Sequence, residues 1–391
     1  MTFMGDYDNA SWTLYWCAGE RYDNNRGNSY LTWAINPTSL DRVSVAMDYM
    51  YRHKTDKDYF MAPNSGAGWI MPTWHYNRTL FPNNENEYSL YPSDVPVWQQ
   101  HCRDYYRISD YSISGWLLDG LGHSITITEA VNYAPFSGDG IGMTVTGSPA
   151  LHNGIPIMSP AGTDPFQQDI INLPSGVNFA CYRTIIVYPS NIQTLEQQWA
   201  GSGNNHQFLD CYTYYYLMRY HLGGSNNYRA TWVDDTIPRV MAAGQTYPVT
   251  VTVRNDGWDT WSEASAYRLG YATVNSEVIP NNGNYGPARA ILPNSVAPGE
   301  TVTFSFNYTA PAVNGTHDLY YDMVQDGGVS WFHENGNIEW KNEIIVATAE
   351  TDVDTDGDGR PDVQEEAKGT LYWHPDDVLF NDADLDSSLT R

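Results

Sequence analysis

Short apolar runs alternate with amphipathic segments along residues 1–225. Runs rich in β-branched and aromatic residues predict strands at 30–35, 58–62, 115–118, 141–145, 155–159 and 183–188. Apolar residues at helical spacing predict helices at 38–52, 94–106, 191–199 and 206–221. The helix at 38–52 has Pro37 and Thr38 at its start, where proline supplies a suitable φ and threonine can cap the helix. This alternation is typical of βαβ units, so we predict an α/β domain with a mostly parallel sheet, open or closed as an incomplete β/α barrel.

The pattern changes near residue 229. From there to 347, segments such as "YPVTVTVRN" and "TVTFSFNYTAP" place β-branched and aromatic residues at period two, with turn residues between them. This favours an immunoglobulin-like β-sandwich. Residues 348–391 are acidic and have too few apolar residues for a core of their own. We therefore predict a multidomain chain with parts at 1–225, 229–347 and 348–391.

The chain opens on "MTFMGDYDN", which reads as the end of a strand followed at once by a polar loop. A domain rarely starts in this way, so we expect further residues upstream. No basic segment followed by an apolar one is visible here, so this stretch does not read as a signal peptide.

Acidic residues outnumber basic ones 46 to 20, for a net charge of −26. This charge repels phosphate backbones and anionic lipids, which argues against nucleic acid and membrane-surface partners. The apolar runs are all shorter than the roughly 20 residues of a membrane-spanning helix.

The side chains suited to special chemistry are scattered. Cys17, Cys102, Cys181 and Cys211 are widely spaced, which favours buried thiols, with one disulfide as an alternative, over a zinc site. The 30 tyrosines and 14 tryptophans often lie in polar, glycine-rich surroundings. They suit surfaces that stack on sugars and equally suit cores with polar edges.

The strongest local motif is "DTDGDGRPDVQE", which follows the calcium-loop pattern D-x-D-x-D-G-x5-E. Calcium takes six to eight hard oxygen ligands, and clustered carboxylates repel one another without a cation. The alternative is an acidic tail without a metal. Pro361 departs from the helix–loop–helix type, and the segment resembles thrombospondin type 3 and dockerin-like calcium loops. The predicted ligands are Asp354, Asp356, Asp358, Arg360 through its carbonyl, Asp362 and Glu365.

Five acids near predicted strand ends are candidates for acid–base chemistry. Asp6 and Asp8 follow the first short strand, and the alternative for them is a turn or helix cap. Asp119, Glu129 and Asp139 are candidate partners, although a cap or turn role is the simpler interpretation of each. Glycoside hydrolysis needs two such carboxyl groups, one as general acid and one as nucleophile or base.

The stretch "NSGAGWIMP" follows the predicted strand at 58–62. Gly66 and Gly68 fit a tight turn, or a loop that brings backbone close to a ligand. Trp69 would then offer an indole face for a sugar. The pattern alone leaves both interpretations open.

"SGAGWIMP" resembles the motif of the GxGYxxP family, whose members are proposed to be glycoside hydrolases. "GDYDN", "LTWAINPTSLD" and "HNGIPIM" resemble other segments of that family, so the likeness spans about residues 3–220. Tyr7 stands where the family has glycine, and Trp69 stands where it has the eponymous tyrosine. The resemblance implies a secreted, bacterial, carbohydrate-active α/β domain, with Gly66, Gly68 and Trp69 shaping the sugar site.

Residues 231–270 resemble the four-tryptophan Ig-like domain, with Trp232, Trp258, Trp261 and Trp331 as its tryptophans. Such a domain would serve as an accessory or spacer module.

Together these features predict an extracellular protein that hydrolyses a glycosidic bond in a polysaccharide with paired carboxylates and binds Ca²⁺ in its tail. The alternative is a non-catalytic module that binds glycans or mediates cell-surface adhesion and is stabilised by calcium.

Overall fold

The computed structural model describes residues 1–7, 11, 13–14, 23–63, 66–68, 70, 95–117, 125–143, 149–152, 154–158, 176–185, 188–201, 205, 207–274, 288–355 and 361–364. The chain divides into two compact units. Unit 1 comprises Met1–Tyr228 and Phe332–Ile338, and unit 2 comprises Arg229–Trp331 and Glu339–Arg391. Among the described helices, none is both long enough and apolar enough to cross a membrane.

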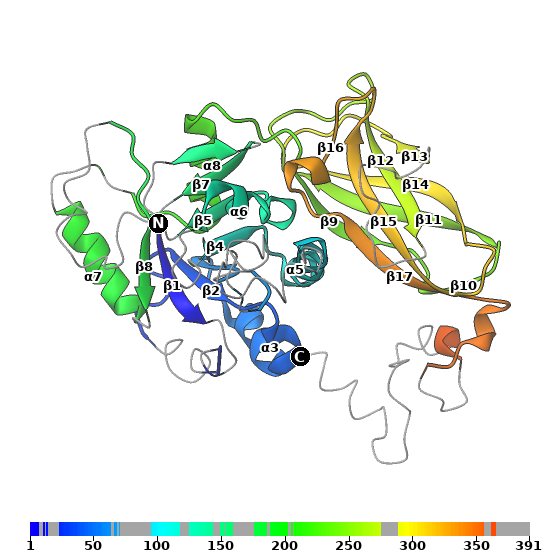
Figure 1. Ribbon diagram of the computed structural model, residues 1–391, viewed down its shortest axis with the longest axis horizontal. Coiled ribbons are helices and arrows are strands. Elements are labelled where there is room, and N and C mark those ends of the chain that lie inside the picture. The colour runs from blue at the N-terminus through cyan, green and yellow to red at the C-terminus, as the bar shows by residue number, and fades with distance from the viewer. Residues whose placement is uncertain are drawn as a thin grey trace, which may run out of the picture. The chain divides into compact units, whose positions relative to one another are not determined.

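Unit 1 contains strands and helices in alternation (Figure 1). Its strands are β1 (Thr2–Tyr7), β2 (Leu31–Ile35), β3 (Asp58–Met61), β4 (Ile113–Leu117), β5 (Gly140–Met143), β6 (Ala150–His152), β7 (Ile155–Met158) and β8 (Tyr182–Ile185). Its helices are α2 (Ser39–Arg42), α3 (Ser44–His53), α5 (Val95–Ser109), α6 (Ile127–Val131), η4 (Ala134–Phe136), α7 (Pro189–Ala200), α8 (Cys211–His221) and η6 (His333–Asn335).

The strands of unit 1 form two four-stranded sheets, with orders β3-β2-β1-β8 and β4-β5-β7-β6. All pairs of the first sheet are parallel, and in the second only β6 runs antiparallel to its neighbour β7. A parallel bridge between Ala62 and Ser114 connects the end of β3 to β4. The pairings between described residues show no closed barrel.

Helices cover both faces of the first sheet. Successive side chains of a strand point to opposite faces, so Trp33 and Ala34 of β2 enter different clusters. Trp33 packs in the cluster that holds Met47 of α3 and Cys102 of α5. Ala34 packs in the cluster that holds Tyr214 of α8. Burial on both faces explains why the strands appear in the sequence as nearly continuous apolar runs.

Two predicted helices differ from the structure, one by an internal break and one by its start. The helix predicted at 38–52 divides into α2 and α3 at Val43, whose φ of −145° and ψ of 49° are not helical. Thr38 makes no cap, because its hydroxyl donates to Asn36 Oδ1 at 2.9 Å. The helix predicted from 206 begins at Cys211, because Asp210 Oδ1 accepts from the backbone N–H of Thr213 at 2.8 Å and caps it there. The short elements α6, η4 and β6 were not predicted.

Unit 2 is a β-sandwich (Figure 1). Its elements are β9 (Ala230–Asp235), β10 (Val240–Ala242), β11 (Thr246–Asn255), β12 (Tyr267–Val274), β13 (Arg289–Ile291), β14 (Thr301–Thr309), β15 (Gly315–Gln325), β16 (Ser330–Trp331), β17 (Trp340–Ala347) and η7 (Glu350–Asp352). One sheet has the order β14-β11-β9, and the other runs β10-β17-β15-β12-β13 with β16 beside β15. All pairs are antiparallel except β10–β17, so the chain as a whole carries mixed sheets.

Two of the predicted sandwich tryptophans have clear packing roles. Trp261 is fully buried. The Trp331 ring lies between Gly270, where a β-carbon would approach it to 2.5 Å, and the Arg289 guanidinium, 4.5 Å from the ring centre. Glycine at 270 therefore makes room for the indole.

Candidate functional site

The carboxyl ends of β1, β2 and β3 lie at one edge of the first sheet. Tyr7 pairs with Ile35, and Ala34 pairs with Met61, so the three strands end level with one another. Asn36 follows β2 directly, and the segment 62–68 follows β3. Ligands of open parallel sheets bind beyond the carboxyl ends of the strands. We call this side the carboxyl edge and consider it the candidate site.

The Gly66–Gly68 loop has a backbone that suits glycine. Gly66 and Gly68 have φ angles of +90° and +117°, in the region that residues with a β-carbon rarely adopt. A β-carbon on Gly66 would also lie 3.0 Å from Cys102 Sγ, whereas one on Gly68 would lie 3.6 Å from the Trp98 ring, an ordinary contact. The sequence motif therefore reflects a real conformational requirement at both positions.

Four hydrogen bonds hold this loop along its length. The N–H of Gly66 donates to Pro63 O at 3.2 Å, and the N–H of Ala67 donates to Cys102 Sγ at 3.4 Å. His101 Nε2 lies 2.9 Å from Ala67 O and donates to it, because a carbonyl only accepts. The N–H of Gly68 donates to Asn36 Oδ1 at 3.1 Å. The loop is thus fixed to β2 and to α5.

One face of α5 forms the wall beside the loop. Trp98, His101, Cys102 and Tyr105 recur at helical spacing on that face. The Trp98 and His101 rings stack with centres 5.4 Å apart, and the His101 and Tyr105 rings meet edge to face at 4.9 Å. The Tyr105 hydroxyl donates to Asp41 of α2, and this bond together with burial raises the pKa of Tyr105. Burial raises the pKa of the Cys102 thiol, which therefore stays protonated.

Sequence reasoning did not single out Asn36, His101 or Cys102 as site residues. Two signals were available. The Asn36-Pro37 pair directly follows a strand and marks a turn. His101 and Cys102 share an apolar and aromatic helix face that must pack on something. Neither signal identifies the loop as the partner, because the contact depends on tertiary packing.

Glu129 is used as a helix cap. Its carboxylate accepts from the backbone N–H of Thr126 at 2.5 Å, and its own N–H donates to the Thr126 hydroxyl at 3.3 Å. This reciprocal pair is a capping box at the start of α6. The side chain is buried, so its carboxylate is committed to the helix end.

Asp139 lies at the amino end of β5, on the far side of β4 from the end of β3. It directly precedes β5 and is level with the start of β4, because Ile113 pairs with Gly140. Its carboxylate accepts from Ser112 Oγ at 2.5 Å and lies 3.8 Å from Arg219 Nη1. Because β4, β3 and β2 lie between β5 and β1, the structure does not bring Asp139 together with the end of β1.

The remaining predicted site residues are described only in part. Asp6 lies in β1, close to its carboxyl end, and only its backbone is described. Asp8, Trp69 and Asp119 lie outside the described residues. The structure accordingly places Gly66 and Gly68 at the same edge as the end of β1 and leaves the acid pair untested.

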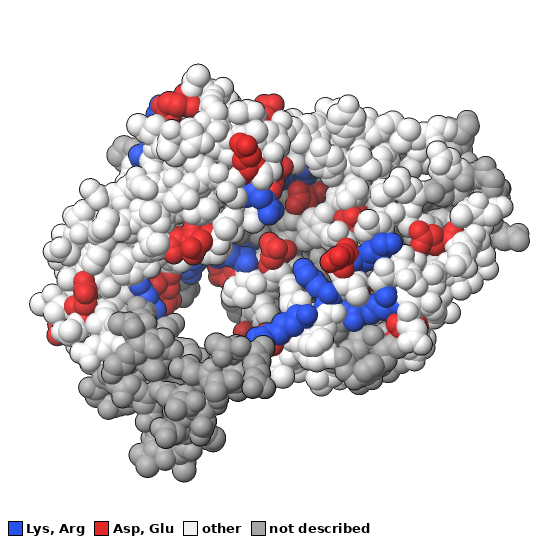
Figure 2. All heavy atoms as spheres, turned by 180° about the vertical axis from the view of Figure 1, so that it is seen from behind, with Lys and Arg blue, Asp and Glu red and all other residues white. Residues whose placement is uncertain are grey.

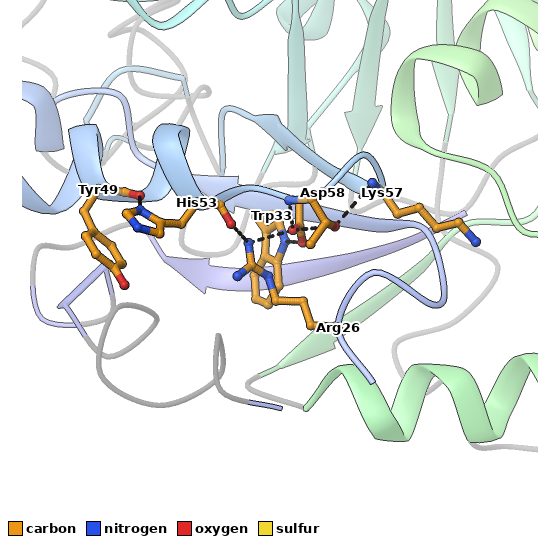
Figure 3. Close-up of polar contacts among 7 residues, drawn as sticks. Arg26, Trp33, Tyr49, His53, Lys57 and Asp58 are labelled. Carbon is orange, nitrogen blue, oxygen red and sulfur yellow. Dashed lines mark hydrogen bonds and ion pairs between the residues drawn. The ribbon is translucent and has the colours of Figure 1, made fainter. Parts of the chain in front are cut away.

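The amino ends of β2 and β3 carry a second polar cluster, which we call the Asp58 cluster (Figure 3). Asp58 Oδ2 accepts from Arg26 Nη2 at 2.7 Å and from the N–H and hydroxyl of Thr55 at 2.7 and 2.8 Å. Asp58 Oδ1 accepts from Trp33 Nε1 at 2.8 Å, and Arg26 Nη2 also donates to His53 O at 2.7 Å. The side chains of Arg26 and Asp58 are only 8% and 1% exposed. This cluster stabilises the fold and leaves its carboxylate fully engaged.

Within the part of the chain that the structure describes, three or more metal-binding side chains do not come together. Of the predicted calcium ligands, Asp354 and Asp362 are described, whereas Asp356, Asp358, Arg360 and Glu365 are outside the described residues. The buried Asp362 carboxylate accepts from the N–H and hydroxyl of Thr355 at 2.7 and 2.6 Å and from Arg239 Nη1 at 2.5 Å. Burial alone would raise the pKa of Asp362, but these bonds outweigh it and lower the pKa.

Acidic and basic side chains lie next to one another on the molecular face of Figure 2. The ion pairs of unit 2 include Arg268 with Glu263 at 2.6 Å and with Asp326 at 3.3 Å. Such exposed pairs contribute little stability, and they neutralise the basic side chains locally.

Two families match parts of the chain. The family described as "GxGYxYP putative glycoside hydrolase C-terminal domain" matches residues 1–118, and that described as "Ig-like domain from next to BRCA1 gene" matches residues 236–338. These matches confirm the two resemblances for those residues, the first over a shorter span than the expected 3–220. The likeness of residues 354–365 to other calcium loops stays a prediction. No curated protein matches the chain.

Solved structures show weak likenesses. The CARDB domain of a Pyrococcus furiosus protein is 15% identical with a TM-score of 0.21, over 31% of this chain and 93% of that one. The same domain in complex with di-metal ions is 16% identical with a TM-score of 0.20, over 30% of this chain and 84% of that one. A "putative hydrolase" from Bacteroides thetaiotaomicron is 16% identical with a TM-score of 0.40, over 56% of this chain and 44% of that one. These TM-scores are low, so the likenesses assign neither fold nor function.

Proposed function

We propose that unit 1 acts on glycans as a glycoside hydrolase-like domain, with its sugar site at the carboxyl edge. The observation that carries the proposal is the Gly66–Gly68 loop. Its positive φ angles and four hydrogen bonds hold a backbone segment at the strand ends, beside the aromatic face of α5. The match of residues 1–118 to a glycoside hydrolase-type family supports the same assignment.

Hydrolysis would use two carboxyl groups, one as general acid and one as nucleophile or base. Asp6 and Asp8 at the end of β1 are the first candidates, and Asp119, two residues beyond β4 in the sequence, is the candidate partner. The pair would lie about 5 Å apart in a retaining enzyme and roughly 6.5–9.5 Å apart in an inverting one. Trp69 would stack on a sugar ring next to the fixed backbone of Gly68.

A glycan-binding module without hydrolysis is the second candidate. The favouring observation concerns two candidate acids, because Glu129 caps α6 and Asp139 lies at the amino end of β5, separated from β1 by three strands. A site with a fixed loop and an aromatic wall but only one carboxyl group would bind sugars without cleaving them.

A polysaccharide panel separates these functions. Reducing-sugar release and binding affinity would be measured for the chain and for Asp6→Asn, Asp8→Asn and Asp119→Asn. Asp48→Asn is the control, since Asp48 forms an exposed pair with Arg52 on α3. Release that falls at least 100-fold in an acid variant and persists in the control supports hydrolysis. Binding without release supports the binding module instead, and an absence of both contradicts a function on glycans.

For residues 354–365 the proposal is an extracellular calcium loop. The motif supports it, and Asp362 would hold the loop against the sandwich through Arg239. A rise in melting temperature with about 1 mM calcium over chelator, lost in Asp358→Asn, is expected. Equal melting temperatures in calcium and chelator would contradict the loop.

A further inference from the structure

Three donors converge on a single oxygen atom of Asn36. The Oδ1 atom accepts from the Thr38 N–H at 3.0 Å, from the Thr38 hydroxyl at 2.9 Å and from the Gly68 N–H at 3.1 Å. Two of these donors are backbone N–H groups, which cannot accept. The atom that they share must therefore be the amide oxygen, and this fixes the orientation of the side chain.

Asn36 joins two strand ends that are far apart in the sequence. Asn36 directly follows β2, and only 3% of its surface is exposed. Its side chain bonds to a loop 32 residues further along the chain. The bond to Thr38 sets the turn after β2, so the same oxygen that shapes one strand end holds the other. The Gly68 N–H is partly buried, so loss of this acceptor would leave it poorly satisfied.

We infer that Asn36 is the positioning residue of the sugar site. It fixes the backbone of Gly68, and the chain continues from there into Trp69, the proposed stacking platform. This inference rests on the proposed function. A ring that stacks on a sugar must keep its place without the sugar, because an ordering cost at binding lowers the affinity. The amide of Asn36 is uncharged, so it holds the Gly68 backbone at the carboxyl edge without adding a charge there.

Substitutions at position 36 distinguish the role of the hydrogen-bond acceptor from the role of side-chain size. Asn36→Ala removes the acceptor, and Asn36→Ser shortens its reach. Asn36→Asp keeps an oxygen in place, and three donors stabilise a carboxylate there. Asp58→Asn is the matched control, because it perturbs the other ends of the same strands β2 and β3.

Two readouts are needed. Hydrogen exchange at the Gly68 amide reports whether Asn36 anchors the loop, and glycan affinity reports whether the anchor serves the site. In Asn36→Ala we expect at least tenfold faster exchange at Gly68 and about tenfold weaker binding. In Asn36→Asp, Gly68 exchange and glycan affinity should both stay within about threefold of the values of the unaltered chain. The values of Asn36→Ser should lie between those of the aspartate and alanine variants. Asp58→Asn should lower stability and leave both readouts of the folded protein unchanged.

Several results would overturn the inference. Unchanged exchange at Gly68 in Asn36→Ala and Asn36→Ser would show that Asn36 does not anchor the loop. Faster exchange with unchanged affinity would show that the anchor does not serve the sugar. If Asn36→Ala does not fold, the contrast between the serine and aspartate variants decides. If the unaltered chain binds no glycan, the proposed function fails together with the sugar role, and exchange still decides whether Asn36 anchors the loop.

Discussion

The two ends of β2 and β3 are held together in different ways. At the amino ends, the buried carboxylate of Asp58 accepts hydrogen bonds from the Arg26 guanidinium, the Trp33 indole N–H, and the N–H and hydroxyl of Thr55. At the carboxyl ends, a neutral amide and a histidine hold backbone groups of a glycine loop. A buried ion pair, Arg26 with Asp58, stabilises the amino ends, to which we assign no ligand. A fixed backbone, held by side-chain hydrogen bonds, shapes the end proposed to meet a ligand.

Removal of the Asp58 carboxylate should have the largest effect. Asp58→Ala leaves the Arg26 guanidinium buried without its counter-ion and the Trp33 N–H without its acceptor. We expect a loss of about 3–5 kcal/mol in the free energy of unfolding, measured with denaturant. The control is Asp48→Ala, because the exposed Asp48–Arg52 pair contributes about 0.5 kcal/mol or less. Similar losses in both variants would show that the Asp58 cluster does not hold the amino ends.

Alanine in the glycine loop should have an intermediate effect. Gly66→Ala combines an unfavourable positive φ with a β-carbon 3.0 Å from Cys102 Sγ, so we expect a loss of about 2–3 kcal/mol. Gly68→Ala adds backbone strain, but its β-carbon makes only an ordinary contact with the Trp98 ring. We expect a loss of about 1–2 kcal/mol in the free energy of unfolding.

Gly154 offers a matched control for the loop. Its φ of +76° is also positive, but nothing lies within 4 Å of its β-carbon position. Gly154→Ala should therefore cost about as much as Gly68→Ala and less than Gly66→Ala. Equal losses in all three variants would argue that the Cys102 contact has no energetic role.

The smallest effect should come from Asp23, near the start of α7. Burial alone would raise the pKa of Asp23, but hydrogen bonds from Ser190 and from the Asn25 N–H outweigh it and lower the pKa. The folded pKa lies below the unfolded value of about 3.9, so the carboxylate stabilises the fold above that pH. This stability is lost as the pH falls through the folded pKa.

Asp23→Ala tests this directly. We expect it to cost about 1 kcal/mol at pH 7, the size of a helix-cap contact, and less below about pH 4. Unfolding curves of both proteins at several pH values measure the difference. A difference that stays constant down to pH 2 would contradict the role of the ionised carboxylate.

Much of unit 1 was predictable from local patterns. The runs at 30–35 and 58–62 became β2 and β3 almost unchanged, because strands buried on both faces need continuous apolar side chains. Gly66 and Gly68 were predictable as special positions, because only glycine adopts positive φ at low cost. The break at Val43 was not, because the segment keeps its helical apolar spacing across it.

The candidate acids show where local reasoning ends. Glu129 lies in the first turn of the short helix α6, where it closes a capping box. Asp139 directly precedes the short strand β5 and contacts Ser112 and Arg219. Whether an acid lies at the carboxyl or amino end depends on strand direction and register. The spacing of acids along the chain does not contain that information.

The sequence by itself determined the strand and helix periods, the acidic surface, the glycine loop and the Ig-like pattern, because each depends on backbone geometry or composition within a short window. Only the tertiary structure decided that Asn36 meets Gly68 and that Arg26 meets Asp58. Each pair is 32 residues apart. Such contacts arise from the parallel register of β2 and β3, which forms only when helices bury both faces of the sheet.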